Sequence, residues 1–162
     1  MDTKKHTLSL LVENEPGVLA RISGLFSGRG FNIESLCVAE TNEDNVSRVT
    51  LVTTGDLNIL EQIKKQLNKL ISVIKVLDFA NTPFVQRELA LIKINAKPEN
   101  RAEILRMVDI FRSRIVDVSS DHYTVEMTGN EEKITAFLQL LKPFGIKEIA
   151  RTGAIALARE RK

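Results

Sequence analysis

One order of predicted strands and helices occurs twice along the chain, and this repetition constrains the fold more than any other feature. In the first half, alternating apolar residues predict strands, and apolar residues at helical spacing predict amphipathic helices. The predicted order is strand–helix–strand–strand–helix–strand, with strands at 7–12, 33–40, 46–54 and 73–79 and helices that begin at Pro16 and after Asp56.

The second half repeats this order after an interruption. Its predicted strands lie at 89–95, 115–119, 123–128 and 146–151, with helices that open at Pro98 and after Asn130 and a short extra strand at 154–158. The interruption is rich in turn-forming residues. We therefore predict a first domain over 1–79, a linker over 80–86 and a second domain over 87–162.

Each copy has the pattern of a split β-α-β arrangement, in which two helices cover one face of an antiparallel sheet. The predicted fold class is α+β, with two tandem ferredoxin-like βαββαβ domains. Domains of roughly 80 residues bury a modest fraction of their surface. Because exposed sheet edges also favour pairing, we expect at least a homodimer.

Composition and charge exclude several classes of function. Of the 162 residues, 43% are hydrophobic and 27% are charged, which is the balance of a globular protein. The net charge of +2 gives no general attraction for nucleic acid or acidic membranes. No apolar run approaches the roughly 20 residues that span a bilayer. The N-terminus lacks a signal-peptide core and the one cysteine, Cys37, cannot form an intrachain disulfide, so we expect a cytoplasmic protein.

The RNA-recognition motif shares the same element order and is an alternative. Arg29-Gly30-Phe31 matches the start of its longer signature. That signature lies on the third strand, however, and carries further aromatic residues that stack on bases. Here the tripeptide precedes the second predicted strand, and aliphatic residues occupy the third. Nucleic-acid binding is therefore not predicted.

No catalytic constellation is visible in the sequence. His6 and His122 lack cysteine or histidine partners at metal-binding spacing and are predicted to be surface residues. Cys37 lies in a strand among small residues, with no sign of a base that would activate it. We predict no catalytic residue and no metal site.

The polar segment Asn14-Glu15-Pro16-Gly17 joins the first strand to the first helix and is the best candidate for a binding site. Pro16 fits the first helical position, and Gly17 allows a ligand to approach the backbone because it has no Cβ. An exposed helix N-terminus offers free N–H groups and a positive dipole end, which suits a small carboxylate. The alternative is that this segment is only a good strand-to-helix turn.

These residues, with others along the chain, carry a resemblance to a known family. The matching stretches are 13–19, Gly24-Leu25-Phe26, 29–36, Ser47-Arg48, 61–70, Arg87-Glu88-Leu89, Lys93, Phe111-Arg112, 115–118 and Arg151-Thr152-Gly153. The first half resembles an ACT domain, the small amino-acid-sensing module of metabolic enzymes. The whole chain resembles the small regulatory subunits of acetohydroxyacid synthase, also called acetolactate synthase.

The resemblance implies a non-catalytic subunit that binds a large catalytic subunit, raises its activity and confers feedback inhibition by a branched-chain amino acid, usually valine. It implies no cofactor on this chain, with thiamine diphosphate, Mg²⁺ and FAD on the catalytic partner. The effector site implied lies between two ACT domains of a homodimer. Its residues are Asn14, Gly17, Val18 and Leu19 of one subunit with Asn32 and Ile33 of the other. Plain core packing is the alternative role for the side chains of Val18, Leu19 and Ile33.

Two hypotheses of different classes follow. The first is a regulatory subunit with a thiamine-diphosphate enzyme as its partner. The second is a free-standing amino-acid-binding ACT protein that has no catalytic partner. Co-purification with a large catalytic subunit distinguishes the two.

Overall fold

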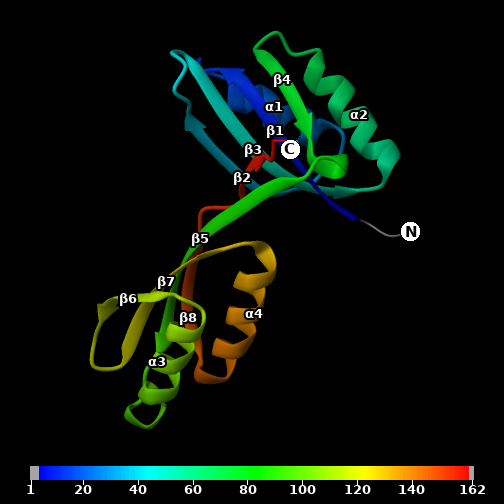
Figure 1. Ribbon diagram of the computed structural model, residues 1–162. Helices are drawn as coiled ribbons and strands as arrows, with labels where there is room; N and C mark the ends of the chain where they lie inside the picture. Colours follow the sequence, from blue (N-terminus) through cyan, green and yellow to red (C-terminus); the bar gives the residue numbers. More distant parts are fainter. Residues whose placement is uncertain (1–3, 161–162) are drawn as a thin grey trace. The chain divides into compact units, whose positions relative to one another are not determined.

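The computed structural model describes residues 4–160, and it divides the chain into two compact units (Figure 1). The first unit contains the chain up to Val85 together with the segment from Ala154 onward, and the second contains Gln86–Gly153. The first three residues of the predicted first domain and the last two of the predicted second domain lie outside the described residues.

The first unit is a four-stranded antiparallel sheet with two helices on one face (Figure 1). Its elements are β1 (Lys4–Glu13), α1 (Val18–Gly28), β2 (Ile33–Glu40), β3 (Val46–Gly55), α2 (Leu57–Asn68) and β4 (Val73–Asp78). The strand order across the sheet is β2-β3-β1-β4, so β2 and β4 are the edges of this path.

The second unit repeats this topology. Its elements are β5 (Phe84–Asn95), α3 (Arg101–Ile110), β6 (Arg114–Val118), β7 (His122–Gly129), α4 (Glu131–Leu141) and β8 (Ile146–Arg151), with short 3-10 turns at Phe79–Asn81, Pro98–Asn100 and Lys142–Phe144. The strand order β6-β7-β5-β8 places the first to fourth strands as in the first unit. The predicted α+β class with two βαββαβ repeats is confirmed.

Alternation along β1 explains how the first core forms. Leu8, Leu10 and Val12 are at most 3% exposed and point toward the helices. Val18, Ile22 and Phe26 recur every four residues on α1, so they lie on one face and cover these strand residues. The second unit builds its own core in the same way from β5, β7, α3 and α4.

The structure differs from the expected division at two places. Strand β5 begins at Phe84, inside the predicted linker 80–86, and β9 (Ile155–Ala158), which pairs with β5, groups with the first unit instead of the second. The amide of Ala154 donates to Ser35 Oγ at 3.2 Å. Ala154 and Ala156 are 3% exposed, because side chains this small let the segment pack closely.

His6 also differs from its prediction as a surface residue. Its side chain is 6% exposed, and Nε2 lies 3.1 Å from the carbonyl oxygen of Gly55. The register pairs Lys4 with Gly55 and His6 with Thr53, so the ring reaches back along the neighbouring strand. A polar side chain at a strand start is therefore buried here because the adjacent strand supplies its hydrogen-bond partner.

In the second unit, two stretches that carried the resemblance are in direct contact. Arg151 donates from Nε to Glu88 Oε1 at 2.5 Å and from Nη2 to Oε2 at 3.0 Å. Beside them, the amide of Thr152 donates to the carbonyl of Leu89 at 3.0 Å. Glu88 is 6% exposed, and its hydrogen bonds raise the pKa of Arg151. This bidentate pair links the end of β8 to β5.

Glu88→Gln is expected to lower the free energy of unfolding by about 1–3 kcal/mol, because a charged hydrogen-bond acceptor is lost beneath β8. Urea unfolding measures the change. The matched control is Glu148→Gln, which removes the exposed partner of Lys93 and should leave stability nearly unchanged. Equal destabilisation by both variants would show that the buried position of Glu88 does not matter.

Candidate effector-binding loop

The loop between β1 and α1 is a tight Pro-Gly turn. Pro16 was predicted at the first helical position, but the helix begins at Val18 and Gly17 is its N-cap. Gly17 has φ +86° and ψ −7°, and the amide of Val18 donates to the carbonyl of Glu15 at 3.4 Å. These values define a type II turn, in which proline occupies the second position and glycine the third.

Gly17 is therefore required for its backbone conformation. A positive φ of this size is unfavourable for residues that carry a Cβ. A Cβ built at Gly17 would meet no atom within 4 Å, so the space beside this residue is open. A ligand can therefore approach the backbone there. The positive φ, however, and not this open space, explains why glycine occupies position 17.

The positive end of the α1 dipole, at the N-terminus of the helix, has no compensating negative charge. The first amides of α1 have no carbonyl partner within the helix. The helix has no side-chain cap at Gly17 and no acidic residue in its first turn. The amide of Val18 is used in the turn, so the dipole of α1 and the amides that follow Val18 in the first turn are available to a small anion at the loop.

Neighbouring segments hold the loop in place. The amide of Asn14 donates to the carbonyl of Asn45 at 2.7 Å, and the amide of Glu13 donates to that of Ser72 at 2.9 Å. The side chain of Asn14 donates from Nδ2 to Glu40 Oε1 at 2.9 Å. Sequence reasoning missed Glu40; its place at the end of a strand beside a polar turn was the available signal.

The predicted apolar residues occupy different environments. Val18 is 4% exposed and belongs to the core, so core packing is the role that the structure gives its side chain. Ile33 is half-buried and packs against the same core. Leu19 is 44% exposed, which leaves its side chain available at the surface beside the helix start.

Asn32 and Ile33 lie at the opposite end of the sheet from Asn14. Strands β1 and β2 both run antiparallel to β3, so they run parallel to each other. Ser47 pairs with Glu40 and Val12, whereas Thr53 pairs with Ile33 and His6. At about 3.3 Å per residue, the two ends are separated by roughly 20 Å. One protomer therefore does not bring the two predicted halves of the site together.

Asn32 has one contact that fixes its backbone. Its carbonyl accepts a hydrogen bond from Thr53 Oγ1 at 2.7 Å, while the residue itself is exposed. The side-chain amide therefore lies at the surface at the start of β2, the edge strand. This placement leaves the amide accessible to a neighbouring chain.

Residues 4–160 contain no group of three His, Cys, Asp or Glu side chains that could hold a metal ion. None of the helices in this part of the chain is long and apolar enough to cross a membrane. Cys37 is free and half-buried on β2.

A βαββαβ unit with an open helix start after its first strand is the architecture of an ACT domain. Residues 8–75 match the family model of the "AHAS small subunit-like ACT domain", and residues 87–160 match that of the "Small subunit of acetolactate synthase". The chain belongs to the acetolactate synthase small-subunit family, whose members are the regulatory and not the catalytic subunits.

Individual relatives agree with this assignment over nearly the whole chain. The acetolactate synthase small subunit of Aquifex aeolicus is 54% identical over 159 residues, covering 97% of this chain and 82% of that protein. That of Mycolicibacterium smegmatis is 51% identical, covering 97% and 92%. The crystal structure of the small subunit from Thermotoga maritima matches with a TM-score of 0.88 at 41% identity, covering 98% and 99%.

The conformation of Gly17 yields a test of the turn. Gly17→Ala should destabilise the protein by about 1–2 kcal/mol, because an L-residue is strained at positive φ. Gly24→Ala, within the exposed side of the same helix, should instead stabilise it by about 0.5–1 kcal/mol. Thermal unfolding of both variants measures the two opposite shifts, and a stabilising effect at Gly17 would contradict the turn geometry.

Proposed function

We propose that this chain activates the large catalytic subunit of acetolactate synthase and confers feedback inhibition by a branched-chain amino acid, with valine the first candidate. Family membership supports a catalytic large-subunit partner and disfavours the free-standing ACT alternative. The observation that carries the effector proposal is the open, uncapped start of α1 beside Gly17.

The loop provides complementary chemistry for an α-amino acid. The effector carboxylate would accept from the first amides of α1, which is worth about 0.3–1 kcal/mol when exposed. Glu40, which already accepts from Asn14 at this end of the sheet, supplies a carboxylate for the ammonium group. Leu19 and Ile33 would contact the branched side chain, whose full burial is worth about 1.5–3 kcal/mol. Discrimination among valine, leucine and isoleucine depends on about one methylene and should be modest.

The edge position of β2 supports a site shared by two chains. If β2 pairs antiparallel with β2 of a second copy about a two-fold axis, the Asn32 end of one strand meets the Glu40 end of the other. Glu40 contacts Asn14 in its own chain. The pairing therefore brings Asn32 and Ile33 of one subunit to the loop of its partner, and a homodimer completes two identical sites.

A shared site gives the effector a means of acting at a distance. A ligand that contacts both protomers binds more tightly to one dimer geometry and shifts the population toward it. The catalytic subunit would respond to that geometry, and by reciprocity its binding would alter effector affinity. Thiamine diphosphate, Mg²⁺ and FAD belong, in this proposal, to that partner. A cytoplasmic setting is part of the same proposal and fits the single unpaired thiol.

Gly17→Asp should abolish valine binding, because a carboxylate would compete with the effector at the helix start. Gly17→Asn is the matched control, since asparagine has nearly the same size and the same tolerance of positive φ without the charge. Titration calorimetry of the chain and valine inhibition of the reconstituted holoenzyme measure the difference. Full valine sensitivity in Gly17→Asp would overturn the anion site.

Mixed dimers test whether the site is shared. Asn14→Ala and Asn32→Ala should each weaken valine binding in homodimers. In a doubly tagged heterodimer of the two variants, one site carries both substitutions and the other carries none. We expect that heterodimer to recover one site of wild-type affinity per dimer in calorimetry. If each site lay within one chain, mixing would restore nothing.

A further inference from the structure

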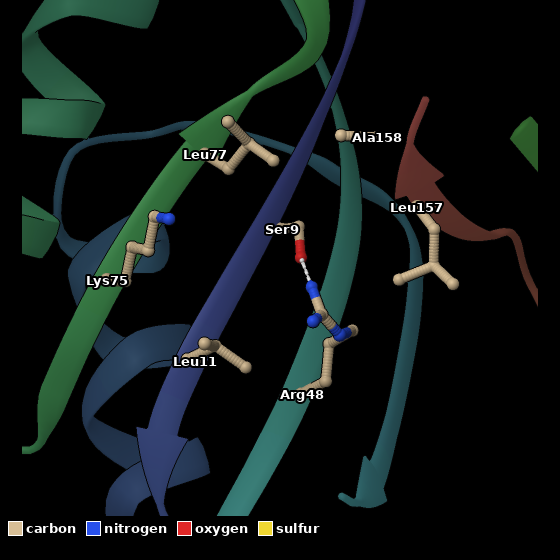
Figure 2. A pocket seen from close by; sticks show the side chains of 7 residues that line it. All are labelled: Ser9, Leu11, Arg48, Lys75, Leu77, Leu157 and Ala158. Carbon is tan, nitrogen blue, oxygen red and sulfur yellow. Dashed lines mark hydrogen bonds between the residues drawn. The ribbon is translucent and has the colours of Figure 1, made fainter. Parts of the chain in front are cut away.

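The sheet face opposite the helices of the first unit contains a pocket. Its volume is about 220 Å³, and the C-terminal segment 154–158 borders it (Figure 2). The residues that line it include Ser9, Leu11, Arg48, Lys75, Leu77 and Leu157. None of them belongs to the loop over 13–19 or to Asn32 and Ile33, so this pocket is separate from the proposed effector site.

Two cations line the pocket, one on each side of Leu11, which pairs with Arg48 on β3 and with Lys75 on β4. Arg48 donates from Nη1 to Ser9 Oγ at 2.7 Å, and Ser9 is 2% exposed, so the guanidinium is held in place by a buried hydroxyl (Figure 2). Lys75 lies on β4 on the same face. Within residues 4–160, neither cation has an acidic partner, and no Asp or Glu lines the pocket. The site is therefore suited to an anion.

Leucines supply the apolar lining of the pocket, interleaved with the polar residues. Leu11 and Leu77 come from adjacent strands, and Leu157 comes from the C-terminal segment (Figure 2). Leu157 is 59% exposed, although Ala154 and Ala156, which precede it in the same segment, are nearly buried. A volume near 220 Å³ is well above what a single water molecule needs, so the pocket can hold a compact organic molecule.

We propose that this pocket binds a short aliphatic carboxylate that has no ammonium group. Arg48, which Ser9 orients, binds its carboxylate, Lys75 on the other side of Leu11 adds a second positive charge, and the leucines contact its hydrocarbon end. An α-amino acid is disfavoured, because its ammonium would lie beside two cations with no carboxylate to pair with. The effector loop differs in this respect, since Glu40 is available there.

Binding also affects the C-terminal segment. Leu157 and Ala158 line the pocket, so a ligand gains contacts only when this segment lies on the sheet. Occupancy therefore adds to the contacts that already hold this segment, in which β9 pairs with β5 and the amide of Arg159 donates to the carbonyl of Pro83 at 2.8 Å. Hydrogen exchange should show greater amide protection of this segment when the ligand is present.

Calorimetry of the full chain with 3-methyl-2-oxobutanoate and with valine tests the proposal, because the two share one carbon skeleton and differ in the ammonium group. We expect saturable binding of the oxo acid that weakens at least tenfold in Arg48→Met and in Lys75→Met. Lys97→Met, an exposed lysine of the second unit, is the control with the same change in charge. Valine affinity should be the same in Lys75→Met and in the unchanged chain.

Several results would overturn the proposal. The first is that the oxo acid does not bind to the unchanged chain. The second is that Lys75→Met retains full affinity for the oxo acid. The third is that Lys75→Met no longer binds valine. Inorganic phosphate is the remaining probe. Phosphate that binds as tightly as the oxo acid, with the same dependence on Lys75, would show that the leucines contribute nothing and that the ligand class is wrong.

Discussion

The first unit depends on the two-sided character of β1, the central strand between β3 and β4. Leu8, Leu10 and Val12 pack against the helices, while Ser9 and Leu11 point to the opposite face of the sheet. A shift of register by one residue would exchange these faces and bury Ser9 in the core. The helix-side core, the effector loop at the end of the strand and the pocket on the open face all require this one register.

The same register explains why a shared effector site is physically reasonable. A parallel relation between β1 and β2 places the loop and Asn32 at opposite ends of one sheet, too far apart for one amino acid to contact both. Only the unpaired edge of β2 allows a second copy to reverse that relation. Exposed edge strands generally carry a risk of non-specific pairing. Here, pairing through β2 would form the dimer contact and would also complete the ligand site.

Much of this architecture could be predicted from local sequence. The duplicated element order, the core stripe of α1 and the cap at Asp56, whose side chain accepts from the amide of Ile59, are all patterns of short range. The predictions that failed depend on backbone conformation or on long-range contacts. Pro16 precedes the helix because Gly17 adopts positive φ. His6 is buried, and its ring lies within hydrogen-bond distance of a carbonyl 49 residues away. The contact of Ala154 with the first unit is likewise long-range, because its amide donates to the hydroxyl of Ser35.

The proposed effector loop and the open-face pocket would distinguish ligands by a single charged group. At the loop, the helix start would bind a carboxylate and Glu40 would accept from an ammonium, so both charges of an amino acid would be neutralised. On the open face, Arg48 and Lys75 favour the carboxylate alone, and an added ammonium would meet repulsion. An amino acid and its deaminated counterpart have the same hydrocarbon end, so shape cannot distinguish them well. Because one sheet presents both charge patterns, a single regulatory domain could respond to the two forms independently.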